Sequence, residues 1–176
     1  MQKTIYNDSN NFIDFSATLI ENKIKEFKSE IIYIALSGGS TPLPILALLK
    51  EKNLNWNSMR FYMVDERCVP ITSDLSNFKN INNCFFKNIS SEKFPIVTKE
   101  HNYIECVENY KNLLERDLPI AKHGFPVFDL VLLGMGEDGH TASLFPNTEA
   151  LKETKKWVVL NEVKELNTQR ITLTYP

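Results

Sequence analysis

The hydrophobic and polar positions along the chain follow two spacings, one typical of amphipathic helices and one typical of buried strands. The helical spacing places apolar side chains on one stripe, with lysine and glutamate on the opposite side. Four segments carry it: residues 9–28, 42–53, 78–86 and 103–118. The last of them ends before Pro119, and Pro42 suits a first helical turn, where a missing N–H costs nothing.

Short runs of branched and aromatic residues predict strands between these helices. They are residues 31–36, 59–64, 129–133, 157–160 and 171–174. We assign no element to residues 88–100, and we expect one more helix between the third and fourth strands. Helices and strands that alternate in this way favour an α/β fold, in which a mostly parallel sheet is covered by helices on both faces.

The length of 176 residues suits a single domain. The chain ends at Tyr175 and Pro176, directly after a predicted strand, and no closing helix follows. A doubly wound domain does not usually end on a strand. We therefore expect one domain over residues 1–176, truncated at its C-terminal unit.

Polar loops follow three of the predicted strands. They are Ser37–Pro42, Asp65–Arg67 and Gly134–Pro146. In an open α/β sheet, the loops at the carboxyl ends of the strands meet in one crevice, where ligands bind. Because three loops of this kind occur in one chain, we expect them to form one site.

The first loop contains Gly38 and Gly39, which free the backbone so that its N–H groups can turn toward one point. The positive end of the dipole of the following helix favours an anion there. Ser40 and Thr41 add hydroxyl groups. The pattern indicates either a cradle for a phosphate or an oxyanion, or a tight turn with a Ser/Thr helix cap. It is neither a P-loop nor a dinucleotide-binding fingerprint.

The second loop carries Asp65, Glu66 and Arg67 at the end of a strand. Arg67 can supply the positive charge that an anionic ligand requires. The alternative is a solvated charged loop in which the arginine pairs with a nearby acid. Arg170 opens the last predicted strand, and by itself it is equally well explained as a surface charge on an edge strand.

His140 lies in the third loop, among three glycines and two residues after Asp138. An imidazole is suited to take a proton from water near neutral pH, and Asp138 could orient the ring and favour the correct tautomer. Glu137 and Asp138 are weak candidates for a metal site. The sequence has no G-x-S-x-G elbow of a serine hydrolase. The loop therefore predicts a catalytic base that acts without a metal.

The net charge of −2 and the isoelectric point near 6.0 give no general footprint for nucleic acid. Three widely spaced cysteines without a CxxC pair indicate reduced thiols in a cytosolic protein. The N-terminal residues lack the apolar core of a signal peptide, and no apolar run approaches the length of a membrane span. We expect a cytoplasmic protein without a nucleic-acid or membrane partner.

Together, these motifs resemble the 6-phosphogluconolactonase family. The resemblance is carried by Ser37–Pro42, Asp65–Pro70 followed by Ser76 and Asn77, Gly134–Pro146, and Arg170–Thr174. These segments span nearly the whole chain in the order found in the family. Asn147 stands where the family usually has a glycine, at the expected start of the helix after the third loop. The resemblance implies a Rossmann-like three-layer α/β sandwich, shared with glucosamine-6-phosphate deaminases and ribose-5-phosphate isomerases.

The resemblance also implies hydrolysis of 6-phosphoglucono-δ-lactone to 6-phosphogluconate, a step of the oxidative pentose phosphate pathway, without a cofactor or metal. His140 would be the general base on the attacking water, supported by Asp138. Arg67 and Arg170 would hold the phosphate, and Asp65 would position sugar hydroxyls or Arg67. The first loop would line the site with Gly38, Gly39, Ser40 and Thr41.

Glucosamine-6-phosphate deaminases are the nearest alternative, because they look similar in the Asp-Gly-His loop. They carry Asp-Glu-Tyr at the position of Asp65–Arg67 and a glutamate at that of Phe145, and both differences favour the lactonase. A non-catalytic sugar-phosphate-binding domain is a second alternative, but the sequence shows no accompanying helix-turn-helix or basic face. Some family members are fused to glucose-6-phosphate dehydrogenase, which makes that enzyme an expected partner by fusion or association.

Overall fold

The computed structural model describes residues 9–98 and 102–176. The first eight residues, for which the sequence shows no signal-peptide pattern, therefore lie outside the described part. Within it, no helix has the length and apolar character needed to cross a membrane.

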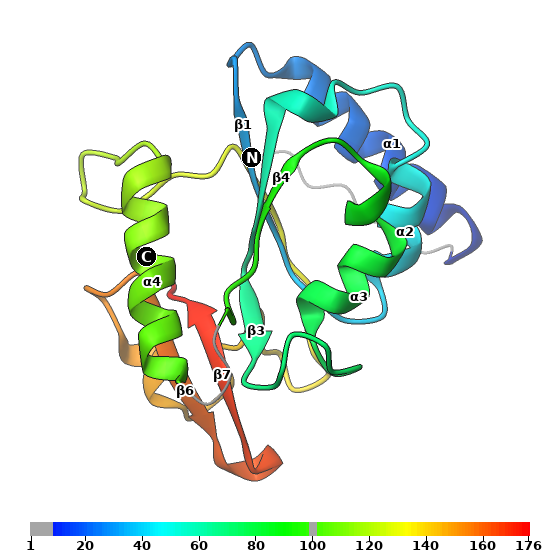
Figure 1. Ribbon diagram of the computed structural model, residues 1–176. Helices are drawn as coiled ribbons and strands as arrows, with labels where there is room; N and C mark the ends of the chain where they lie inside the picture. Colours follow the sequence, from blue (N-terminus) through cyan, green and yellow to red (C-terminus); the bar gives the residue numbers. More distant parts are fainter. Residues whose placement is uncertain (1–8, 99–101) are drawn as a thin grey trace.

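A four-stranded parallel sheet forms the centre of the molecule, with the strand order β4-β2-β1-β5 (Figure 1). Its strands are β1 (Ile32–Leu36), β2 (Met59–Met63), β4 (Glu92–Phe94) and β5 (Leu130–Leu132). Three of them confirm predicted strands. Strand β4 was not predicted, since its three residues are too few to show a periodic pattern. The parallel sheet confirms the α/β fold.

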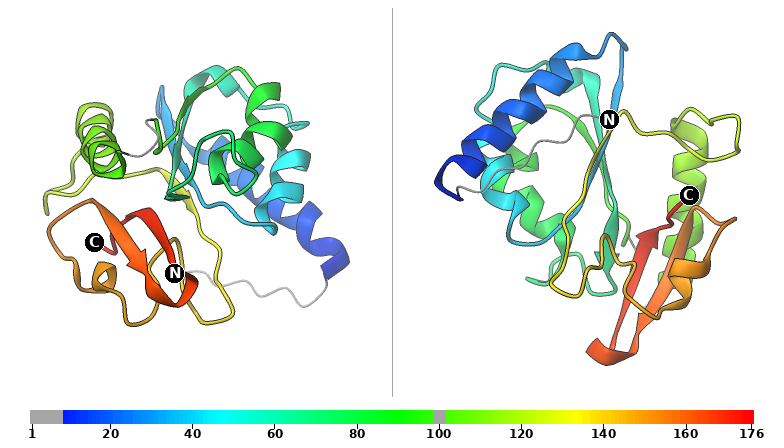
Figure 2. Two further views of the ribbon diagram at one scale, coloured as in Figure 1. Left: turned by 60° about the horizontal axis from the view of Figure 1, so that its bottom comes forward. Right: turned by 180° about the vertical axis from the view of Figure 1, so that it is seen from behind.

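Helices cover both faces of this sheet and give the molecule three layers (Figures 1 and 2). On one face lie α1 (Ser9–Glu26), α2 (Pro42–Leu49) and α3 (Asn77–Cys84), and on the other lies α4 (Tyr103–Asp117). Local sequence explains two of the starts. The Ser76 hydroxyl accepts a hydrogen bond from the Lys79 N–H at the start of α3, and the Asn102 side chain does the same for Glu105 at α4.

A second, three-stranded antiparallel sheet packs beside the first, with the order β3-β7-β6. It consists of β3 (Asp65–Arg67), β6 (Val158–Val163) and β7 (Thr168–Leu173). The last two predicted strands are therefore present, but they pair with each other and do not extend the parallel sheet. Because β7 is the central strand, the interpretation of Arg170 as a charge on an edge strand is wrong.

The helix expected between β5 and β6 is absent. Only a 3-10 turn, Glu149–Lys152, lies there. Asn147 adopts a left-handed conformation, with a φ of 62°, which ends any continuous helical path from Pro146. The carboxylate of Glu153 then accepts hydrogen bonds from the next three backbone N–H groups and fixes an extended exit from the turn.

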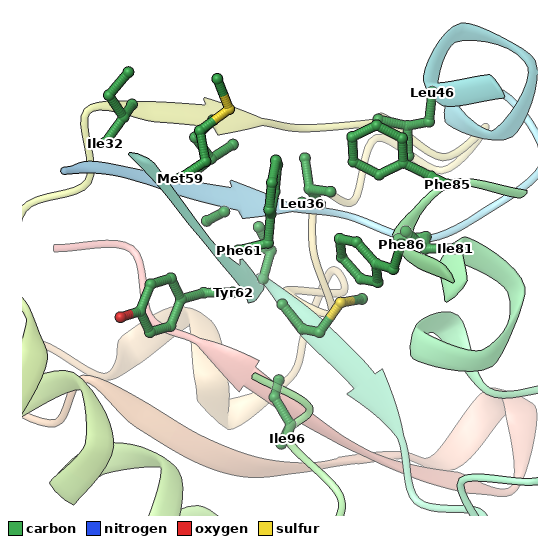
Figure 3. Packing of buried hydrophobic residues seen from close by; sticks show 14 of the residues in the cluster. Ile32, Leu36, Leu46, Met59, Phe61, Tyr62, Ile81, Phe85, Phe86 and Ile96 are labelled. Carbon is green, nitrogen blue, oxygen red and sulfur yellow. The ribbon is translucent and has the colours of Figure 1, made fainter. Parts of the chain in front are cut away.

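An aromatic cluster holds the parallel sheet against α2 and α3 (Figure 3). Phe61 of β2 meets Phe85 edge to face, with ring centroids 5.4 Å apart, and Phe86 packs against both rings. On the other face, the Tyr110 hydroxyl of α4 donates to the Met63 carbonyl at 2.7 Å and accepts from its N–H at 2.8 Å. This pair of bonds fixes the carboxyl end of β2, and with it the position of Asp65.

Candidate active site

The three polar segments meet in one cleft of about 530 Å³, as the sequence predicted, although the second of them, Asp65–Arg67, is strand β3 and not a loop. Strands β2, β1 and β5 are neighbours in the sheet, so their carboxyl ends lie side by side. Backbone hydrogen bonds continue the pairing into the loops, from the Ser37 N–H to Leu132 at 3.0 Å and from the Val64 N–H to Leu36 at 2.9 Å. The cleft lies where the loops face the antiparallel sheet. All predicted site residues except Asp138 line it: Gly38, Gly39, Ser40, Thr41, Asp65, Arg67, His140 and Arg170.

Asp138 contacts His140 directly and orients its ring. Its Oδ1 lies 2.5 Å from Nδ1 of His140 and also accepts the His140 backbone N–H at 3.2 Å. The Gly139 φ of 84° makes the sharp turn that lets the two side chains meet. Because an ionised carboxylate only accepts, the proton lies on Nδ1, and Nε2 keeps its lone pair in the neutral ring. The hydrogen bond to His140 lowers the pKa of Asp138.

The imidazole ring of His140 is confined from two further directions. Phe145 stacks on it, with ring centroids 3.9 Å apart and an interplanar angle of 22°. Gly136 lies against it so closely that a Cβ at this position would collide with Cε1 and Nδ1 of the ring. The loop itself is held by the Thr141 hydroxyl, which donates to the Gly134 carbonyl at 2.9 Å. The ring therefore has little freedom to leave its orientation toward the cleft.

Arg67 and Arg170 provide the positive charge of the cleft. They occupy opposite positions in the antiparallel register of β3 and β7. Arg67 donates from Nη1 to the Leu75 carbonyl at 2.7 Å, and this bond anchors its guanidinium. Burial and the neighbouring charge of Arg67 lower the pKa of Arg170. Two guanidinium groups held together in this way are suited to an anion that both can contact.

Asp65 is a buried carboxylate beneath these arginines, with 6% of its surface exposed. Its Oδ2 accepts a hydrogen bond from the Ser143 hydroxyl at 2.6 Å, which connects the second loop to the third. Burial raises the pKa of Asp65, whereas the Ser143 bond and the charge of Arg170 oppose that effect. Asp65 thus links the loop that contains His140 to the antiparallel sheet that carries Arg67 and Arg170.

The first loop lies between the end of β1 and the start of α2. Gly39 has a φ of 99°, a conformation that favours glycine. Thr41 stands at the N-cap position of α2, but its side chain makes no capping hydrogen bond. The helix-cap interpretation is therefore wrong for Thr41. The loop N–H groups and the positive end of the α2 dipole remain suited to an anionic ligand or oxyanion.

Four further polar residues build the site, and the sequence assigned none of them a role of its own, although all four lie in the segments that it singled out. Ser37, Asn77 and Ser143 line the cleft. Glu66 does not line it, but its carboxylate binds the backbone of residues that do. The buried Glu66 carboxylate accepts hydrogen bonds from the backbone N–H groups of Arg67, Asn77 and Phe78 and from the Ser76 hydroxyl. The sequence feature that pointed to Glu66 was its position next to Asp65 at the end of a predicted strand. Ser37, Asn77 and Ser143 belong to the segments that carry the family resemblance, but no local pattern indicated what their side chains do.

Buried polar atoms without a hydrogen-bond partner are rare in folded proteins. In the part of the chain that the structure describes they are Ser37 Oγ, Asn77 Oδ1, Ser91 Oγ and Arg170 Nε. Three of these four belong to residues that line the cleft. The protein therefore leaves part of the hydrogen-bonding capacity of these side chains unused. Within residues 9–98 and 102–176, no group of three or more His, Cys, Asp or Glu side chains is arranged to hold a metal ion.

Comparison with known proteins gives one consistent result. The family described as glucosamine-6-phosphate isomerases/6-phosphogluconolactonase matches residues 7–176. The 6-phosphogluconolactonase of Chlamydia pneumoniae is 39% identical over 147 residues, and that of Thermotoga maritima is 38% identical over 151 residues. These matches cover 82% of this chain in both cases, but only 55% and 65% of the two relatives. The chain thus spans less than two thirds of either relative.

Solved structures agree with the sequence comparison. The crystal structure of the Thermotoga maritima 6-phosphogluconolactonase has a TM-score of 0.81 at 30% identity and covers 98% of this chain and 78% of its own. The structure of the 6-phosphogluconolactonase from Trypanosoma brucei has a TM-score of 0.86 at 31% identity and covers 97% of this chain and 75% of its own. The similarity therefore extends over nearly all of the present fold.

Proposed function

Because this chain belongs to the family of glucosamine-6-phosphate isomerases and 6-phosphogluconolactonases, we propose that it hydrolyses 6-phosphoglucono-δ-lactone to 6-phosphogluconate. The observation that carries the proposal is the presence of an oriented imidazole and two paired guanidinium groups in one cleft. Its volume of about 530 Å³ lies in the range usual for small-molecule sites. The substrate needs a base for the attacking water and positive charge for its phosphate, and the cleft offers both.

His140 is the general base of the proposed reaction. Its Nε2 takes a proton from a water molecule as the water oxygen attacks the lactone carbonyl carbon. Nδ1 donates to the Asp138 carboxylate throughout, and the negative charge of that carboxylate stabilises the imidazolium that forms. Phe145 and Gly136 keep the ring in the orientation that this proton transfer requires.

The attack produces a tetrahedral oxyanion, which then expels the ring oxygen. Backbone N–H groups of the Gly38–Thr41 loop are the donors for the oxyanion, assisted by the positive end of the α2 dipole. The proton on His140 passes to the departing ring oxygen, so that the bond between the carbonyl carbon and this oxygen breaks and a hydroxyl forms. Arg67 and Arg170 hold the phosphate, and the charge of Asp65 attracts both guanidinium groups.

A deaminase is disfavoured by the residue beside the base. Ring opening of an aminosugar needs a proton donor at the position that follows the catalytic loop, and the side chain there is Phe145. Phe145 is 6% exposed and stacked on His140, so it excludes water from one face of the ring and transfers no proton.

The substrate implies its source. A lactone of this kind arises by oxidation of glucose 6-phosphate at C1, so a glucose-6-phosphate dehydrogenase is the expected neighbour in the reaction sequence, fused to this chain or separate from it. Lactone and product both carry a charged phosphate and do not leave the compartment where they are made. We propose that this compartment is the cytoplasm and that a phosphosugar lactone is the small-molecule partner.

The proposal is tested by the hydrolysis of freshly generated lactone, coupled to 6-phosphogluconate dehydrogenase and corrected for spontaneous opening. The wild-type chain should exceed the background rate, and His140→Ala should lower kcat by about 10²–10⁴. His123→Ala is the matched control, because His123 is exposed and does not line the cleft. A folded wild-type chain without activity that still binds 6-phosphogluconate would point to a binding domain instead.

The role of Asp138 is tested separately. In Asp138→Asn the side-chain amide donates to Nδ1, which moves the ring proton to Nε2 and removes the base. We expect kcat to fall by about 10²–10⁴ with little change in KM. Glu137→Gln is the control, because Glu137 is the adjacent exposed acid and does not line the cleft. Equal kinetics for the two variants would remove Asp138 from this role.

A further inference from the structure

Asn161 of β6 is a buried polar residue that lies behind the cleft and does not line it. Only 3% of its surface is exposed. In the antiparallel register it stands directly opposite Arg170 of β7, which does line the cleft. Burial of a side-chain amide is unfavourable unless the protein supplies its hydrogen-bond partners. The partners of Asn161 therefore indicate what this amide holds in place.

The Asn161 amide binds the segment that follows His140. Its Nδ2 donates to the Ser143 carbonyl at 2.8 Å and to the Thr148 hydroxyl at 3.1 Å. A carbonyl accepts but does not donate, so the amide must turn its NH₂ group toward the segment. The Thr148 hydroxyl in turn donates its single hydrogen to the Phe145 carbonyl at 2.8 Å. One side chain of β6 thus anchors the segment at two points.

The backbone of this segment is strained at both ends. Ala142 has a φ of 52° and Asn147 a φ of 62°. A left-handed backbone is unfavourable for residues other than glycine, and it persists only where surrounding contacts impose it. Contacts from outside the segment therefore decide its conformation. Asn161 supplies two of them, and the Thr172 hydroxyl, which accepts the Ser143 N–H at 3.2 Å, supplies another.

Two side chains of the anchored segment contact site residues. Phe145 stacks on His140, with ring centroids 3.9 Å apart. The Ser143 hydroxyl donates to Oδ2 of Asp65 at 2.6 Å. The backbone of each of these two residues is bound to the Asn161 amide, directly at Ser143 and through one hydroxyl group at Phe145. A continuous chain of contacts therefore leads from β6 to the imidazole.

We propose that Asn161 is a positioning residue for the general base, because it holds Phe145 in its stack on His140. It also fixes Ser143, and with it the hydrogen bond to Asp65. The role of His140 as the base rests on the proposed function, whereas the contact between the two rings does not. A displacement of about 1 Å in an active site can cost a large part of the rate. Loss of the amide should therefore lower kcat more than it changes KM.

The kinetic test replaces Asn161 by leucine, which has a similar shape and no donor. The Ser143 carbonyl and the Thr148 hydroxyl then lose a partner in a buried place, so the segment should shift. In the lactone assay we expect kcat to fall about 10-fold or more, with little change in KM. An unchanged kcat in a folded Asn161→Leu variant overturns the inference.

Proton NMR reports the position of the ring directly. The chain has three histidines, so the ring signals that disappear in His140→Ala belong to His140. A stacked aromatic ring shields the protons over its face, and Phe145→Ala shows where the His140 signals lie without that shielding. In Asn161→Leu these signals should move in the same direction as in Phe145→Ala. Signals that stay at their wild-type position overturn the inference.

Val163→Ala is the matched control. Val163 is a fully buried residue of the same strand and does not line the cleft. The substitution should lower the melting temperature through the cavity that it leaves, but it should keep kcat and the His140 signals of the wild type. If Val163→Ala lowers kcat as much as Asn161→Leu does, the effect is one of general stability and the inference is overturned.

Thr148→Val decides the question if Asn161→Leu does not fold. It removes only the hydroxyl that joins the Asn161 amide to the Phe145 carbonyl. The same fall in kcat and the same direction of signal movement support the inference, and wild-type values of both overturn it. If the wild-type chain hydrolyses no lactone, the proposed function fails. The NMR comparison, which needs no activity, then decides alone whether Asn161 positions the ring.

Discussion

Arg67 of β3 lies directly opposite Arg170 of β7 in the antiparallel sheet. Like charges at opposed positions destabilise a sheet, and the partial burial of Arg170 adds to that cost. The arrangement is favourable when an anion neutralises both guanidinium groups. The unliganded protein therefore holds two charges in an unfavourable arrangement that a phosphate would relieve.

Replacing Arg170 by glutamine should weaken substrate binding without weakening the fold. We expect KM to rise about 10- to 100-fold with a smaller change in kcat, because a charged hydrogen bond to phosphate is lost. The melting temperature without ligand should stay the same or rise, since the repulsion from Arg67 is removed. The rise in melting temperature on adding 6-phosphogluconate should shrink.

Thermal unfolding with and without 6-phosphogluconate, together with steady-state kinetics, checks this expectation. Lys152→Gln is the control, because the Lys152 side chain is 71% exposed and pairs with Glu149, whose side chain is 85% exposed. It should behave as wild type in both measurements. An unchanged KM in Arg170→Gln would contradict the assignment of Arg170 to the phosphate.

A methyl group at Gly136 should displace the catalytic ring. In Gly136→Ala the new Cβ collides with Cε1 and Nδ1 of His140, so the ring must leave its bond to Asp138. We expect kcat to fall at least about 10-fold, because a displaced base loses much of its contribution. Gly134→Ala is the control, since a Cβ there meets nothing within 4 Å. Equal activity of the two variants would show that the ring tolerates movement.

The hydrogen bond between Asp138 and His140 should also appear in the pH dependence of stability. It lowers the pKa of Asp138 below the ordinary value of 3.8 in the folded state. The stabilisation is therefore present above about pH 4 and is lost as the pH falls through the folded-state pKa. The melting temperature of the wild type should exceed that of Asp138→Asn by a constant margin between about pH 6 and 5, and the margin should shrink as the pH falls toward 4.

That margin should disappear as the pH is lowered further. Glu137→Gln, measured over the same pH range, should show no such difference from the wild type. A margin that grew in acid would contradict the sign of this linkage.

The carboxylate of Glu66 should be important for the stability of the fold. It accepts four hydrogen bonds, three from backbone N–H groups and one from Ser76. In Glu66→Gln only one oxygen remains to accept these hydrogen bonds. The NH₂ group that replaces the other oxygen is itself a donor, so it cannot bond to the N–H or O–H groups that faced that oxygen. We expect the free energy of unfolding to fall by about 2–4 kcal/mol, measured by urea denaturation. Glu149→Gln, at an exposed site, should change it by less than about 0.5 kcal/mol.

The elements and the pairing within the Gly134–Pro146 loop could be predicted from the sequence because their causes are local. The apolar spacing of Tyr103, Tyr110 and Leu114 is a property of one segment, and it defines α4 without reference to the rest of the chain. The Asp138–His140 pair is equally local, since two residues separated by one glycine meet in a single turn. The helix expected after β5 is only a 3-10 turn at residues 149–152, and this difference has a local cause as well. The cause is the left-handed backbone at Asn147 together with the Glu153 carboxylate.

The sequence alone thus determined most of the strands, most of the helices and the pairing of a histidine with a neighbouring acid. Only the tertiary structure decided that β3 pairs with β7, which sets Arg67 opposite Arg170. It also brought Ser143 to Asp65 and Asn77 onto Gly38. These contacts join segments far apart in the chain, and their register depends on how all the elements pack together. Periodicity within one segment specifies an element and its buried face, but not the partner that the element meets.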